Sequence, residues 1–299
     1  TQTEGCGTHY TMVEAISFSS DGSRIAVATL NGRDVRTPGK AYKADLSRTI
    51  SWLNASTGGD CGIVHEDFNA GNCGPAFGFW RLGRTSALCN PSNDHIAMSA
   101  FGGGDVTLDA ETGKPVASSL HHPAYNIAYS NSGRYLAASG ADELTVLDTY
   151  SGAVAMQVET GDEPFLFASL MSFAHDGTHI VVAGNWGVHV WDIPTSTRIS
   201  AVIDGPEPWV NDISVVPNDT VIVCSDRWIR RYTFAGELLA TLGHTGAYLC
   251  CVSADGHTLA VSSEGQLTTY DVSHNRLIRS FSFDGATALA VSSDGDHIA

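Results

Sequence analysis

Short apolar runs separated by tight polar turns recur along almost the whole chain. The clearest copy runs from Ile16 to Val27, where Ser-Asp-Gly joins two apolar segments. The runs are rich in Val, Ile, Tyr and Phe and are bounded by Gly, Asp, Asn or Ser, which is typical of β-strands. The Asp-Gly pairs supply the positive φ that tight hairpins need. No stretch shows a helical period over many residues, so the pattern predicts an all-β protein built from consecutive hairpins.

The hairpins repeat at a regular spacing. The first apolar residue after each turn marks the register, at Ile25, Ile96, Leu136, Ile180, Ile222, Leu259 and Ile298. The successive gaps are 71, 40, 44, 42, 37 and 39 residues. Five of these six gaps lie close to the ~40–45 residues of a four-stranded propeller blade. Because such sheets bury their faces by stacking radially, the spacing predicts a seven-bladed β-propeller.

The prediction treats residues 1–299 as a single domain. The first blade covers about 13–75, and the long first gap indicates insertions at 33–47 and 59–83. The seventh blade is incomplete, because the chain stops at Ala299 inside the second strand of that blade. An exposed strand edge there would invite aggregation, so we expect this domain to be part of a longer polypeptide.

The repeat resembles the WD40 family over nearly the whole length of the chain. Val190-Trp191-Asp192 matches the Trp-Asp signature, and Gly243-His244 matches the Gly-His pair. The Trp position is replaced in the other repeats, by Leu53, Leu108, Leu147, Tyr232 and Tyr270. These substitutions remove most of the polar network of typical members, so the resemblance implies a degenerate WD40-like propeller and no particular subfamily.

The resemblance also implies where partners bind. In this fold the loops that join blades lie on one rim with the loops between second and third strands. In this sequence these loops combine aromatic residues with charged ones, as interface hot spots do. The alternative is that each ring only caps its own blade. The candidate partner-binding residues are Tyr125, Asp162, Glu163, Phe165, Trp186, Glu207, Trp209, Arg227, Trp228 and Tyr248.

Composition narrows the class of partner. The net charge is −16, which disfavours nucleic acid because an acidic surface repels the phosphate backbone. The charge fits basic protein or peptide partners, or it serves solubility alone. No apolar run is long enough to span a membrane. The seven cysteines form no disulfide framework, which favours a reducing compartment such as the cytoplasm; a Cys61–Cys73 bridge is the alternative for an exported protein.

Catalytic and metal chemistry receive little support from the sequence. No nucleophile elbow, phosphate loop or zinc-protease motif is present. Cys6, Cys61, His65 and Cys73 match no closed zinc spacing. Four histidines that recur at or just after turns are interpreted as polar turn residues: His95, His179, His257 and His297.

We therefore expect a non-catalytic protein–protein interaction scaffold without cofactor or metal. The alternative is a propeller enzyme or metal-dependent hydrolase with its site at the mouth of the central channel. The residues that such a site would use are His121, Asp162, Glu207 and His244.

Overall fold

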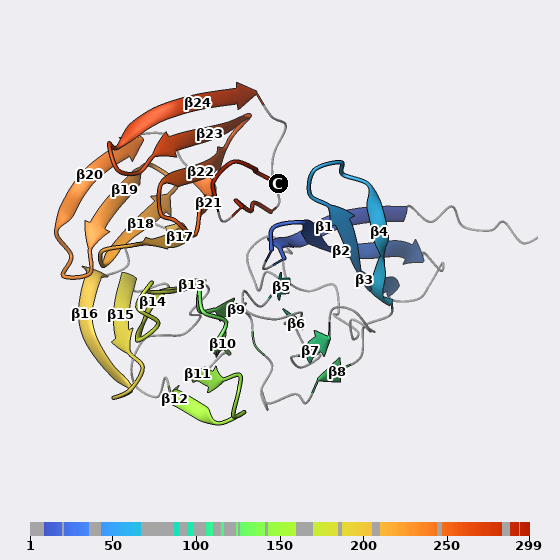
Figure 1. Ribbon diagram of the computed structural model, residues 1–299, viewed down its shortest axis with the longest axis horizontal. Helices are drawn as coiled ribbons and strands as arrows, with labels where there is room; N and C mark the ends of the chain where they lie inside the picture. The colour runs from blue at the N-terminus through green and yellow to red at the C-terminus, as the bar shows by residue number, and fades with distance from the viewer. Residues whose placement is uncertain are drawn as a thin grey trace, which may run out of the picture.

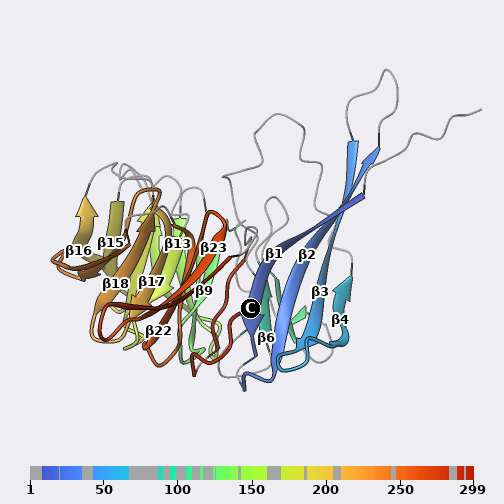
Figure 2. The ribbon, with the colours of Figure 1, turned by 90° about the horizontal axis from the view of Figure 1, so that it is seen from above.

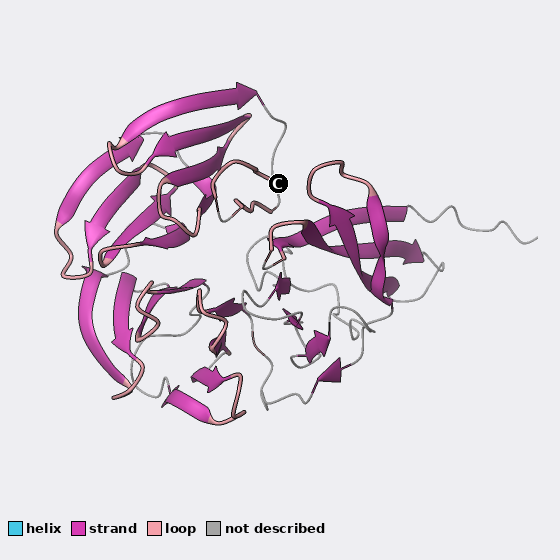
Figure 3. Cartoon of the chain, in the orientation of Figure 1, coloured by secondary structure: helices cyan, strands magenta, loops and turns pink. Residues whose placement is uncertain are grey.

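The structure is a computed structural model. It describes residues 9–19, 21–35, 43–66, 87–89, 95–98, 106–109, 115–116, 124, 126–140, 143–159, 170–184, 187–204, 210–243, 247–282, 288–292 and 294–299. The described elements are strands, joined by turns and loops (Figure 3). The all-β prediction is therefore confirmed.

The strands form six antiparallel sheets, each made of four strands that follow one another in the chain. The first sheet holds β1 (His9–Phe18), β2 (Arg24–Val35), β3 (Lys43–Asn54) and β4 (Asp60–Glu66). The second holds β5 (Ala87–Cys89), β6 (His95–Met98), β7 (Val106–Asp109) and β8 (Pro115–Val116). The third holds β9 (Asn126–Tyr129), β10 (Tyr135–Ser139), β11 (Glu143–Asp148) and β12 (Val154–Glu159).

The remaining three sheets follow the same plan. The fourth holds β13 (Leu170–Phe173), β14 (His179–Gly184), β15 (Gly187–Asp192) and β16 (Thr197–Asp204). The fifth holds β17 (Val210–Val216), β18 (Thr220–Ser225), β19 (Ile229–Thr233) and β20 (Leu238–Gly243). The sixth holds β21 (Ala247–Val252), β22 (Thr258–Ser263), β23 (Gln266–Asp271) and β24 (Arg276–Ser282).

The sheets are arranged as the blades of a β-propeller (Figure 1). The first strands of neighbouring sheets contact one another, so each blade has its first strand inside and its fourth strand outside. The predicted count of seven blades is not found in the described residues. Five blades have strands of at least four residues throughout, whereas the β5–β8 sheet has shorter ones. After β24 the described residues form only one isolated bridge, between Val291 and Ile298.

The turn between the first and second strands of a blade is held by its own side chains. In the sixth sheet Ser253 Oγ donates to Asp255 Oδ1 and accepts the N–H of Thr258 at 3.0 Å. Gly256 follows with φ +76°, and a Cβ there would lie 2.4 Å from Pro217 Cδ of the neighbouring blade. Glycine is required here because the backbone is left-handed and the next blade is close.

The core lies between the blades. One cluster joins Met156 of β12 to Phe173 and Trp191 of the next blade. Two further clusters join the β13–β16 sheet to the β17–β20 sheet, and that sheet to the β21–β24 sheet. The core includes the buried cysteines Cys224 and Cys250. Each blade is therefore stabilised mainly by burying apolar surface against its neighbours.

The first strands are also joined by one repeated hydrogen bond, which we call the inter-blade latch. Ser172 Oγ accepts the N–H of Val215 at 3.3 Å, and Ser214 Oγ accepts the N–H of Val252 at 3.2 Å. At the equivalent position of β21, the sulfur of Cys251 accepts the N–H of Val291. Burial raises the pKa of this thiol to about 11, and the hydrogen bond opposes that shift.

The first sheet is longer than the others. β2 and β3 remain paired from Arg24–Asn54 out to Val35–Lys43, so the predicted insertion at 33–47 largely extends this hairpin. Figure 2 shows the extended strands leaving the rim of the propeller. The second predicted insertion, 59–83, begins with β4, where Cys61 is exposed and carries a free thiol. Residues 67–83, and with them Cys73, lie outside the described residues.

Candidate functional site

The structure describes three of the ten candidate partner-binding residues. Arg227 and Trp228 lie in the turn between β18 and β19, and Tyr248 lies at the start of β21. The β18–β19 turn and the start of β21 both lie on the predicted binding rim, because that rim consists of the loops after second strands and the loops before first strands. Seven candidates lie outside the described residues: Tyr125, Asp162, Glu163, Phe165, Trp186, Glu207 and Trp209.

The β18–β19 turn is fixed by one buried serine. Ser225 is fully buried, and its N–H and hydroxyl both donate to the carbonyl of Trp228, at 2.9 and 3.0 Å. The same hydroxyl accepts the N–H of Arg227 at 3.2 Å and that of Trp228 at 3.0 Å. The turn therefore satisfies its backbone internally, and the two side chains are presented from a fixed frame.

Trp228 is half-buried at this turn and packs against the core between the fourth and fifth sheets. The ring of Tyr232 meets it edge-on, with centroids 6.2 Å apart. The guanidinium of Arg230 stacks over the indole, 4.4 Å from its centroid. Aromatic rings and arginines held rigidly at a rim are the groups that carry most of the energy in protein interfaces.

Arg230 was not among the residues selected from the sequence. The sequence pattern that could have identified it is the alternation Trp228-x-Arg230-x-Tyr232, because residues two apart in a strand lie on the same face. Arg227 extends into solvent, with 71% of its side chain exposed, and its Nε lies 3.8 Å from Asp226 Oδ2. Two arginines therefore lie close to Trp228 in the chain, and one of them stacks on its indole.

Tyr248 reaches the rim through a β-bulge. The register between β21 and β22 shifts between Ala247 and Leu249, and Tyr248 is the extra residue, 52% exposed. β17 has a bulge at the same place, where Asn211 is the extra residue and its amide donates to the carbonyl of Ala247 at 2.9 Å. Bulges redirect a side chain out of the regular alternation, and here they mark the rim end of the inner strands.

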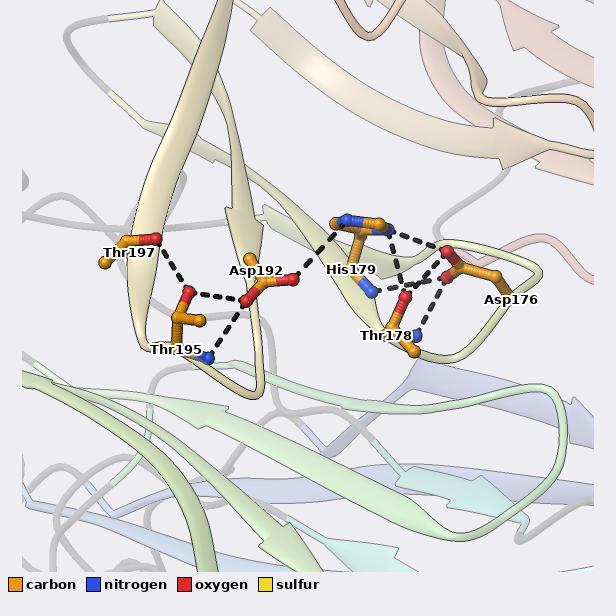
Figure 4. Close-up of polar contacts among 6 residues, drawn as sticks. All are labelled: Asp176, Thr178, His179, Asp192, Thr195 and Thr197. Carbon is orange, nitrogen blue, oxygen red and sulfur yellow. Dashed lines mark hydrogen bonds and ion pairs between the residues drawn. The ribbon is translucent and has the colours of Figure 1, made fainter.

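The opposite ends of the sheets carry a polar cluster of a different kind, shown in Figure 4. It consists of Asp176, Thr178 and His179 from the β13–β14 turn and Asp192, Thr195 and Thr197 around the β15–β16 turn. These side chains point toward one another. The cluster was interpreted from the sequence only through His179, as a polar turn residue.

Every ionisable group of this cluster has an internal partner. His179 Nδ1 lies 2.7 Å from Asp176 Oδ2, and its Nε2 lies 3.6 Å from Asp192 Oδ1. Burial raises the pKa of Asp176, but hydrogen bonds from Thr178 and His179 outweigh it and lower that pKa below its ordinary value. Hydrogen bonds from the hydroxyl and N–H of Thr195 lower the pKa of Asp192. Through His179, the cluster links the β13–β14 turn to the β15–β16 turn.

Other histidines near the turns bond locally. His257 Nδ1 lies 3.1 Å from Ser273 Oγ, and the N–H of His297 donates to Ser292 Oγ at 2.9 Å. The role as polar turn residues is confirmed for His179 and His257. Across the described ranges, no three His, Cys, Asp or Glu side chains are arranged to hold a metal ion. The candidates for an enzymatic channel mouth, His121, Asp162, Glu207 and His244, lie outside the described residues.

The comparisons with known proteins add no relative. Neither a model of a protein family nor a curated protein sequence matches the chain. The described residues include no helix with the length and apolar character that a membrane span requires. The sheet topology shows a β-propeller. Any proposal about function has to be argued from the geometry of the rim.

Proposed function

We propose that this chain is a non-catalytic scaffold that binds a protein or peptide partner on the rim formed by Arg227, Trp228 and Tyr248. The observation that carries the proposal is the arrangement at Trp228, where an indole is fixed by a buried serine, stacked by Arg230 and left half-exposed. Fixed rings lose little conformational freedom on binding, which favours affinity.

The proposal includes a WD40-like architecture of seven repeat units. The inter-blade latch supports the seventh unit, because the Cys251–Val291 bond continues the series begun by Ser172 and Ser214. Residues 288–292 then occupy the place of a seventh inner strand. The turn that follows has the same design as its counterparts, since Ser292 Oγ donates to Asp294 Oδ1 at 2.6 Å and Gly295 has φ +77°.

Affinity capture with the immobilised chain tests the scaffold function. The unmodified chain, Trp228→Ala and Tyr150→Ala are compared by quantitative mass spectrometry of the captured proteins. Tyr150 is the matched control, because it is an aromatic residue, 71% exposed, in the turn between β11 and β12 at the other end of the blades. We expect Trp228→Ala to lower capture of the specific partner by about tenfold or more, the loss typical of a hot spot.

The contrary result is equally clear. Equal capture by Trp228→Ala and the unmodified chain, with both proteins folded by circular dichroism, would remove Trp228 from the interface. Trp209→Ala extends the test to the neighbouring blade junction, where we expect a similar loss.

A further inference from the structure

Two consecutive arginines of β19 lie on opposite faces of the strand and are used differently. Arg231 has acceptors for its guanidinium: its Nε donates to Thr220 Oγ1 at 3.1 Å and its Nη1 donates to the carbonyl of Val272 at 3.0 Å. The second bond reaches the neighbouring blade. Arg231 is therefore a structural residue that joins the fifth and sixth sheets.

Arg230 has no such acceptors. Its Nε is buried and has no hydrogen-bond partner in the part of the chain that the structure describes. Its contact is the stack on Trp228 at 4.4 Å. Buried donors in folded proteins are almost always bonded, so this guanidinium is under-used by the fold. Arg230 as a whole is only partly buried, so part of its side chain stays accessible to a partner.

A second positive charge lies on the same turn. Arg227 precedes Arg230 by three residues and is 71% exposed, and its Nε lies 3.8 Å from Asp226 Oδ2, a carboxylate that is itself 44% exposed. A pair this long and this exposed neutralises little of the charge. The chain as a whole carries −16, but the Debye length is about 8 Å at physiological ionic strength, so a bound group responds mainly to these arginines.

We propose that Arg227, Trp228 and Arg230 form a carboxylate-recognition site, and that the partner presents to it an acidic peptide segment with an apolar neighbour. A guanidinium that stacks on a ring keeps its in-plane N–H donors available, and their fork matches a carboxylate. Trp228 supplies the apolar surface. This inference rests on the proposed scaffold function and replaces the expectation of a basic partner at this part of the rim.

Three short fluorescein-labelled peptides test the inference by fluorescence polarisation. They contain glycine, leucine and one variable residue, which is glutamate, glutamine or lysine. We expect the glutamate peptide to bind about ten- to a hundredfold more tightly than the glutamine peptide, as hydrogen bonds to charged groups allow. Added salt should weaken its binding. Arg227→Ala and Arg230→Ala should each remove most of this preference.

Arg134→Ala is the matched control. Arg134 also lies over an aromatic ring, 5.1 Å from the centroid of Tyr135, but its Nε is paired with Asp148 at 3.0 Å. We expect this variant to bind the glutamate peptide as the unmodified chain does. If a site variant fails to fold, the peptide series and the salt dependence on the unmodified chain still decide the question.

The outcomes separate this inference from the function on which it rests. A glutamate peptide that binds no better than the glutamine peptide overturns the carboxylate site. If the lysine peptide is preferred and its binding requires Trp228, the scaffold stands and the inference about charge is wrong. If Trp228→Ala changes no capture, the scaffold function itself fails at this rim.

Discussion

The charged side chains of the β13–β16 turns and those of the β18–β19 turn differ in how far they bond to one another. At the end that carries Asp176, His179 and Asp192, the ionisable groups bond to one another across two turns. At the end that carries Trp228, Ser225 bonds the backbone of Arg227 and Trp228, whereas the Nε of Arg230 has no acceptor in the described structure. We interpret the first end as a structural rim that stabilises the fold, and we propose the second as the rim that binds a partner.

The largest expected effect on stability comes from the close packing of neighbouring blades at the structural rim. Gly256 lies in a turn of the structural rim with φ +76° and Pro217 of the next blade 2.4 Å from an added Cβ, whereas Gly265 lies between β22 and β23 with φ +72° and open space around it. We expect Gly256→Ala to lower the free energy of unfolding by about 3 kcal/mol, because backbone strain and a clash add. Gly265→Ala should cost about 1 kcal/mol, from strain alone.

Urea denaturation of the two glycine variants measures this difference. Equal losses in the two variants would show that the structural rim is no more closely packed than the other end.

The next effect in size concerns Arg231. Arg231→Met leaves Thr220 Oγ1 and the carbonyl of Val272 without their donor. We expect a loss of about 2 kcal/mol in the free energy of unfolding, the usual cost of leaving buried acceptors unpaired. Peptide binding at Trp228 should be unchanged, since Arg231 lies on the other face of β19. Chemical denaturation and fluorescence polarisation check the two halves of this prediction, and a stability within experimental error of the unmodified chain would contradict the first.

The repeat was predictable because the turns share a recognisable sequence. The Ser-x-Asp-Gly residues around Asp21, Asp255 and Asp294 share the same hydrogen bond from serine Oγ to aspartate Oδ1, and the spacing of apolar residues placed the strands. The number of blades was harder to predict, since spacing counts hairpins rather than complete sheets. The hairpin after β24 shows the difference, because its turn is present and its described pairing is one bridge.

The candidate site was predictable only in part. The sequence proposed Trp228 and Tyr248 because aromatic residues near loops are easy to recognise. It did not propose Arg230, because the role argued for that residue depends on what lies around it: Arg231 is the same residue type one position away and is hydrogen-bonded through Nε and Nη1. Which of two adjacent arginines has acceptors is decided by the neighbouring blade, and no local sequence pattern contains that information.

A smaller effect concerns acid stability of the structural rim. Hydrogen bonds from Ser19 and Ser23 lower the pKa of Asp21 from 3.8 to about 2. Because the pKa is depressed in the folded state, its stabilisation is complete above about pH 4 and is lost as the pH falls toward 2. Asp21→Asn should therefore show a shallower fall of Tm across that interval than the unmodified chain. Parallel Tm curves from pH 5 to pH 2 would contradict this role, and thermal denaturation followed by circular dichroism measures them.

The smallest effect on stability is the sharpest test of the comparison between the two rims. Arg230→Ala removes a side chain whose Nε has no hydrogen-bond partner in the described structure, so we expect the loss to come mainly from its stacking on Trp228. We expect the free energy of unfolding to fall by less than about 1 kcal/mol, well below the loss in Arg231→Met, while binding of the glutamate peptide is largely lost. Of these two variants on one strand, Arg231→Met should lose stability but keep peptide binding, whereas Arg230→Ala should lose peptide binding but keep stability. If Arg230→Ala destabilised the chain as much as Arg231→Met, Arg230 would be a structural residue, and the rim at Trp228 would be the same kind of surface as the one at Asp176.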